Sequence, residues 1–146
     1  MFAFRDRWWL PAPPPAVRDV LVDLERYPVW WPQVVAVASL GPDDARVLCR
    51  SALPYTLDLV MHAVSRELPV LHVELAGHLR GSVRWRLSEE GAGTGVDIAQ
   101  EVTVHGPVAP FAAVLSPLAR WNHGRMMAGG LAGLRRRLAE HPEHEQ

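Results

Sequence analysis

The sequence contains a single cysteine and no lysine. The lone thiol, Cys49, excludes an intramolecular disulfide and a cysteine-based zinc site, which is typical of a protein in a reducing compartment. The 15 basic residues are therefore all arginines, and 16 acidic residues balance them. A near-neutral chain lacks the excess of basic residues that is typical of nucleic-acid-binding proteins, so we expect no nucleic-acid partner.

Long apolar runs are also missing. No stretch reaches the ~18 continuous apolar residues of a membrane-spanning helix, and residues 1–13 lack the basic start and apolar core of a signal peptide. The histidines show no paired ligand spacing, and the "GAGTG" segment lacks the Lys and Ser/Thr of a phosphate-binding loop. We therefore expect a cytoplasmic protein with no integral membrane association, no metal and no cofactor.

At 146 residues, the chain has the length of one domain, which we place at 1–140 with a polar tail at 141–146. Residues 2–10 alternate as a half-buried strand does. The following segment, from Ala12 onward, has an apolar stripe at helical spacing and tolerates its prolines only in the first turn. We expect Pro28 to end this helix, with a short helical turn after it.

Six further strands are predicted after this helix, because short alternating runs are separated by turn signals: 33–40, 45–54, 55–68, 70–77, 81–90 and 96–106. Seven strands with short connections indicate an antiparallel sheet with one apolar face. The clearest alternation puts Val83 and Trp85 on that face and Arg84 and Arg86 on the other. Gln100 is the exception, since it is a polar residue at an apolar-face position.

The last long segment, 110–141, is an amphipathic helix by its spacing. His123, Met127, Gly130 and Leu131 fall on its apolar side at ~100° per residue. No other predicted element is long enough to cover the apolar face of the sheet. We therefore expect this helix to pack against that face.

The order of these elements and four segments carry a family resemblance: "LPAPPPAVRDVLVDLERYPVWWP", "GHLRGSVRWRL", "GTGVDIAQEV" and "WNHGRMMAGGLAGLRRRL". The chain resembles the helix-grip superfamily of START-like (SRPBCC) proteins, which includes polyketide cyclase/dehydrase-like and lipid-transfer domains. The resemblance covers nearly the whole chain. It implies an α+β helix-grip fold, in which a seven-stranded antiparallel sheet wraps around a long C-terminal helix and two short helices follow strand 1.

The resemblance also implies an internal cavity between sheet and helix, and hence a hydrophobic small-molecule ligand, lipid-like or polycyclic. Tyr27, Trp30 and Trp31 would wall one end of it; alternatively, they plug the end of an ordinary core. The candidate ligand-binding residues are Trp30, Trp31, Tyr55, Leu57, Leu59, Met61, Val83, Trp85, Ile98, Gln100, Asn122, His123, Met126, Met127, Gly130 and Leu131.

Two other functions remain open at this stage. The first is a polyketide aromatase/cyclase in which His123 acts as acid/base, assisted by Gln100 and Tyr55. In the competing interpretation, His123 is a core histidine hydrogen-bonded to a strand group. The second is a protein-interaction or coenzyme-Q-binding-like role, suggested by a "YP" segment shared with such proteins. The sequence is compatible with a monomer or a homodimer.

Overall fold

The structure is a computed structural model, and it describes residues 2–50, 56–105 and 116–140 of the chain. The predicted site residue Tyr55 and the predicted tail 141–146 lie outside the described residues. The elements in chain order are β1 (Phe2–Leu10), α1 (Pro14–Val22), the 3₁₀ turn η1 (Leu24–Arg26), α2 (Tyr27–Trp30), β2 (Val34–Ser39), β3 (Asp44–Arg50), β4 (Thr56–Ser65), β5 (Val70–Gly77), β6 (Leu79–Glu90), β7 (Gly93–Val104) and α3 (Ser116–Glu140).

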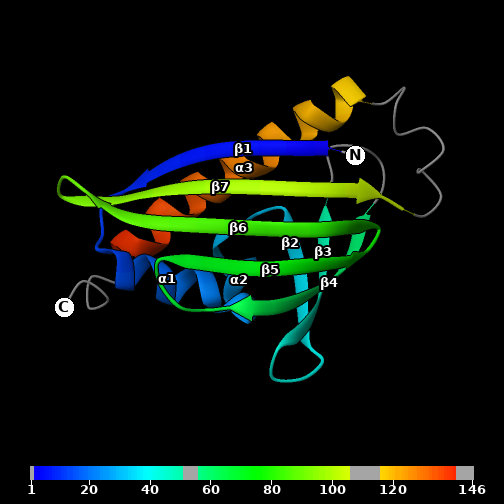
Figure 1. The fold of residues 1–146 in the computed structure, drawn as a ribbon, viewed down its shortest axis with the longest axis horizontal. Coiled ribbons are helices and arrows are strands. Elements are labelled where there is room, and N and C mark those ends of the chain that lie inside the picture. The colour runs from blue at the N-terminus through cyan, green and yellow to red at the C-terminus, as the bar shows by residue number, and fades with distance from the viewer. Residues whose placement is uncertain (1, 51–55, 106–115, 141–146) are drawn as a thin grey trace.

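The strands form one seven-stranded sheet in the order β1-β7-β6-β5-β4-β3-β2, and all neighbours are antiparallel. Strands that follow each other in the chain therefore pair, except that β1 joins the far edge beside β7. The long α3 crosses this sheet, and α1 and α2 contact α3 (Figure 1). The predicted α+β helix-grip fold is confirmed.

The boundaries of the first helix differ from the prediction. α1 begins with prolines in its first turn and buries Ala16, Val17, Val20 and Leu21. It ends at Val22 because Asp23 has a ψ of 73°, outside the helical region. Pro28 does not end this helix. It lies in the first turn of α2, where its missing N–H costs no hydrogen bond.

The alternation along the strands places the side chains as predicted. Val83 and Trp85 are buried on the face toward α3, whereas Arg84 and Arg86 are exposed. Along α3, the buried side chains recur at helical spacing from Met127 through Leu134 and Leu138. None of the described helices combines the length and apolar character needed to cross a membrane.

An aromatic cluster joins α2 to the sheet. The ring centroid of Trp31 lies 6.1 Å from that of Trp8 and 6.4 Å from that of Trp85, and those of Trp8 and Trp85 lie 5.5 Å apart in an edge-to-face arrangement. The Trp31 indole N–H donates to the Met126 carbonyl of α3 at 2.9 Å. This bond fixes the indole between helix and sheet, so the cluster holds three layers of the fold together.

Candidate functional site

A cavity of about 130 Å³ lies between the inner face of the sheet and α3. Its lining is almost entirely aliphatic and aromatic, and strands β3 to β7 supply most of it. Alternate residues of a strand point to one face, so each strand contributes every second side chain. The arrangement removes apolar surface from water, which stabilises a bound apolar molecule by ~25 cal/mol per Å² buried.

Most of the predicted ligand-binding residues border this cavity: Trp31, Leu57, Leu59, Met61, Val83, Trp85, Ile98, Gln100, Met126 and Met127. The others that the structure describes, Trp30, Asn122, His123, Gly130 and Leu131, are not part of its lining. The tertiary arrangement therefore brings the strand residues together and leaves part of the predicted helix face outside the site.

Gly130 shows why the helix face differs from the prediction. A Cβ atom at this position would lie 2.6 Å from the Trp31 indole ring, so the ring packs directly on the glycine backbone. Trp31 therefore occupies the place where we expected a ligand to contact Gly130. Trp30 is 2% exposed and packs in the core next to Tyr27, at a centroid distance of 4.8 Å. Of the predicted aromatic wall, Tyr27 and Trp31 line the cavity and Trp30 does not.

His123 lies where α3 passes over the edge strand β1. Its Nε2 is 2.8 Å from Oδ2 of Asp6, and its ring stacks on Phe4 with centroids 3.8 Å apart. The His123 side chain is 12% exposed and that of Asp6 is 26% exposed. This contact agrees with the competing interpretation, in which His123 is a core histidine hydrogen-bonded to a strand group. It connects α3 to β1.

We expect His123→Gln to lower the free energy of unfolding by about 1–2 kcal/mol, because it removes the stacking on Phe4 and replaces the ring's bond to Asp6 with that of a more flexible amide. Binding of an apolar dye should change less than twofold, since His123 does not border the cavity. Chemical denaturation and dye titration of the same sample measure both quantities. A tenfold loss of dye affinity at unchanged stability would instead place His123 in the binding site.

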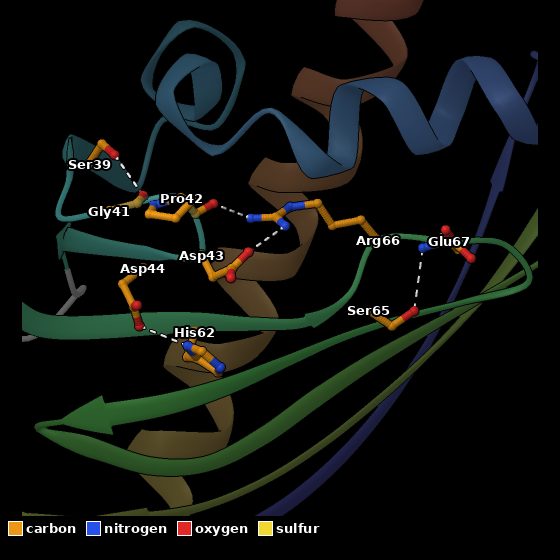
Figure 2. A network of polar contacts seen from close by, with 9 residues as sticks. All are labelled: Ser39, Gly41, Pro42, Asp43, Asp44, His62, Ser65, Arg66 and Glu67. Atoms are coloured by element: carbon orange, nitrogen blue, oxygen red, sulfur yellow. Dashed lines mark hydrogen bonds and ion pairs between the residues drawn. The ribbon is translucent and has the colours of Figure 1, made fainter.

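One end of the cavity is bounded by Val22, Leu24 and Arg66, and the same three residues border a second, polar pocket of about 150 Å³. Figure 2 shows Arg66 reaching from the end of β4 to the β2–β3 turn, where its guanidinium donates to Asp43 Oδ1 at 2.8 Å and to the Pro42 carbonyl at 2.7 Å. The Arg66 carbonyl in turn accepts a bond from Arg18 of α1 at 2.8 Å. Arg66 thus connects three segments around this end.

A second polar contact lies beside this turn. His62 Nδ1 is 2.9 Å from Asp44 Oδ1 on the neighbouring strand (Figure 2). The hydrogen bond to the Asp44 carboxylate raises the pKa of His62. Because the contact is exposed to solvent, it contributes little to stability.

The cavity offers little acid–base chemistry among the described residues. Burial raises the pKa of the Cys49 thiol to about 12, so this group is a neutral thiol and not a nucleophile at pH 7. Burial likewise raises the pKa of the Tyr27 phenol, whose hydroxyl donates to the Leu21 carbonyl. No group of three or more His, Cys, Asp or Glu side chains with metal-binding geometry occurs within the described part of the chain.

Besides Tyr27 of the predicted wall, the lining contains residues that we did not predict as ligand-binding residues: Leu21, Val22, Leu24, Val34, Cys49, Ala63, Ser65, Arg66, Leu71, Val73, Leu75 and Leu79. The sequence does contain a signal for some of them. The alternation that gave Leu57, Leu59 and Met61 continues to Ala63 and Ser65 along the same strand. Arg66 has no such signal, because its position depends on the turn between β4 and β5.

The family comparison agrees with this architecture. Residues 1–139 match the family model described as polyketide cyclase / dehydrase and lipid transport. The chain belongs to this family. No protein of curated function matches the chain.

Several solved structures share the fold of this polyketide cyclase-like chain. A protein from Thermus thermophilus is similar at a TM-score of 0.83 with 20% identity, covering 95% of this chain and 98% of the other. A START superfamily protein from Mycobacterium smegmatis has a TM-score of 0.78 and 16% identity, covering 94% and 97%. The Zhui aromatase/cyclase from Streptomyces sp. R1128 has a TM-score of 0.74 and 13% identity, covering 97% and 95%. At these identities the likeness shows the fold alone.

Proposed function

We propose that this polyketide cyclase-like protein binds a hydrophobic small molecule, lipid-like or polycyclic, in the cavity between its sheet and α3. The observation that carries the proposal is the cavity itself, which is lined by apolar side chains from α1 to α3. Apolar pockets with few polar groups are the usual form of small-molecule sites. Residues 1–140 would act as one binding domain in the cytoplasm, as a monomer or a homodimer.

The fold explains why such a cavity persists. Neighbouring strands and α3 are held by the Trp31–Met126 hydrogen bond and by the aromatic cluster around Trp8 and Trp85. Trp31, Trp85 and Met126 themselves border the cavity, so these contacts fix part of its wall between helix and sheet. A preformed site avoids the ordering cost that an adaptable one incurs on binding.

We expect the folded protein to bind one equivalent of the neutral dye N-phenyl-1-naphthylamine, with an affinity on the order of micromolar. Dye fluorescence rises in an apolar site, so a titration gives both stoichiometry and affinity. Guanidinium unfolding of the same sample should abolish the signal at the midpoint seen by tryptophan fluorescence. Native mass spectrometry of freshly purified protein would identify a retained cellular ligand. A linear, non-saturating dye signal would contradict the proposal.

The aromatase/cyclase function receives less support from the described residues. Its proposed acid/base, His123, contacts Asp6 and Phe4 and does not border the cavity. Gln100 does border the cavity, but a carboxamide acts neither as an acid nor as a base near pH 7. We therefore favour binding over catalysis as the function of this site.

A further inference from the structure

The polar side chains around the cavity differ in whether they are already hydrogen-bonded within the protein. The Tyr27 hydroxyl donates to Leu21, the Trp31 indole donates to Met126, and the Ser65 hydroxyl donates to the Val70 carbonyl at 3.0 Å. These hydrogens are committed to backbone oxygens of the protein. A ligand gains no hydrogen bond from them without breaking an existing one.

Gln100 is different. Its side chain borders the cavity, and its carboxamide has no hydrogen-bond partner among the described residues. Its polar atoms also retain accessible surface, whereas the unpartnered polar atoms of Trp30, Gln33 and His72 are fully buried. A carboxamide offers two donor hydrogens and an acceptor oxygen. In an apolar cavity, leaving such a group without a partner disfavours the bound state.

The charged side chains around the cavity indicate that the ligand is neutral. Arg66 is the one charged residue among the described lining residues, and its guanidinium is already bonded to Asp43 and Pro42. Gln100, Val83, Val73 and Ala63 lie in one row across four neighbouring strands. Three strand spacings separate the ends of this row, about 14 Å along the sheet. Gln100 therefore lies far from Arg66. On its other side, Gln100 pairs with Phe4 of β1, whose ring stacks on His123, and His123 is itself bonded to Asp6. The ionisable side chains nearest to Gln100 are thus partners of each other.

We infer that the ligand is a neutral, mainly apolar molecule that carries a hydroxyl or carbonyl group bonded to the Gln100 carboxamide. This inference rests on the proposed binding function. A hydroxyl or carbonyl satisfies the amide, whereas a purely apolar molecule leaves it unpaired. An anion buried beside Gln100 loses its hydration, while Arg66 is bonded to Asp43 and the nearby Asp6 carboxylate is bonded to His123. Gln100 is thus a specificity-determining residue, and it selects by hydrogen bonding within a site that otherwise binds by apolar contact.

Three probes that share one ring system test this inference: naphthalene, 2-naphthol and 2-naphthoate, each measured at pH 7 by displacement of N-phenyl-1-naphthylamine. The wild-type chain should bind 2-naphthol about tenfold more tightly than naphthalene, and 2-naphthoate at least tenfold more weakly than 2-naphthol. In Gln100→Leu, the preference for 2-naphthol over naphthalene should vanish or reverse. Circular dichroism of each variant establishes that it is folded.

Met127→Leu is the matched control, because Met127 also borders the cavity, is buried and has no strong hydrogen-bonding group. It should change the affinities for naphthalene and 2-naphthol by the same factor. Equal binding of these two probes by the wild-type chain overturns the inference, and so does tighter binding of 2-naphthoate. Both results leave the proposed function intact as long as the dye binds. A folded wild-type chain that binds no dye overturns both.

Discussion

Gly133→Ala is expected to lower the free energy of unfolding by about 3 kcal/mol or more, and the melting temperature by roughly 10 °C. A Cβ atom at Gly133 of α3 would overlap the backbone carbonyl oxygen of Trp30 in α2. A backbone atom has no side-chain rotamer through which to move away. The methyl group therefore separates α2 from α3, which disturbs the Trp30 and Trp31 packing as well. Thermal and chemical denaturation measure the loss.

Gly124→Ala in the same helix is the matched control. A Cβ at Gly124 meets no atom within 4 Å, so the substitution adds a methyl group in open space. Alanine has the higher helix propensity, and the variant should be more stable by about 0.5–1 kcal/mol. The same substitution thus has opposite signs at two positions of α3. Equal effects at the two glycines would contradict the close approach of α2 and α3.

Ala63→Phe should weaken the binding of N-phenyl-1-naphthylamine at least tenfold, while the chain remains folded. Ala63 of β4 borders the cavity, and its neighbour in the sheet, Val73, does so as well. A phenyl ring at this position occupies much of a cavity of about 130 Å³. Because the ring fills existing space, we expect stability to stay within about 1 kcal/mol of the wild type. Dye titration and denaturation of the same variant measure the two effects.

Val64→Phe serves as the control, since Val64 is the next residue along β4 and is 50% exposed. It introduces the same ring on the solvent side and should leave dye affinity within twofold of the wild type. If the dye bound Ala63→Phe and Val64→Phe with equal affinity, its site would lie outside this cavity.

The sequence by itself determined the order of helices and strands and the inner face of those strands that alternate clearly. Val83 and Trp85 face inward and Arg84 outward because strand side chains alternate with a period of two, a property of the local backbone. The same reasoning placed Leu57, Leu59, Met61 and Gln100 at the cavity. Each of these assignments needs only the strand's own pattern and a decision about which face is buried.

Only the tertiary structure decided which inward-facing residues border open space and which are packed. Gly130 lies on the buried side of α3, but the neighbour that it meets there is Trp31, which is distant in sequence. His123 meets Asp6, 117 positions away, and Arg66 meets Asp43, 23 positions away. A helical wheel gives the direction of a side chain but not the distance to the next element. That distance depends on how the large rings of α2 and the curvature of the sheet separate α3 from each strand, and no local pattern contains it.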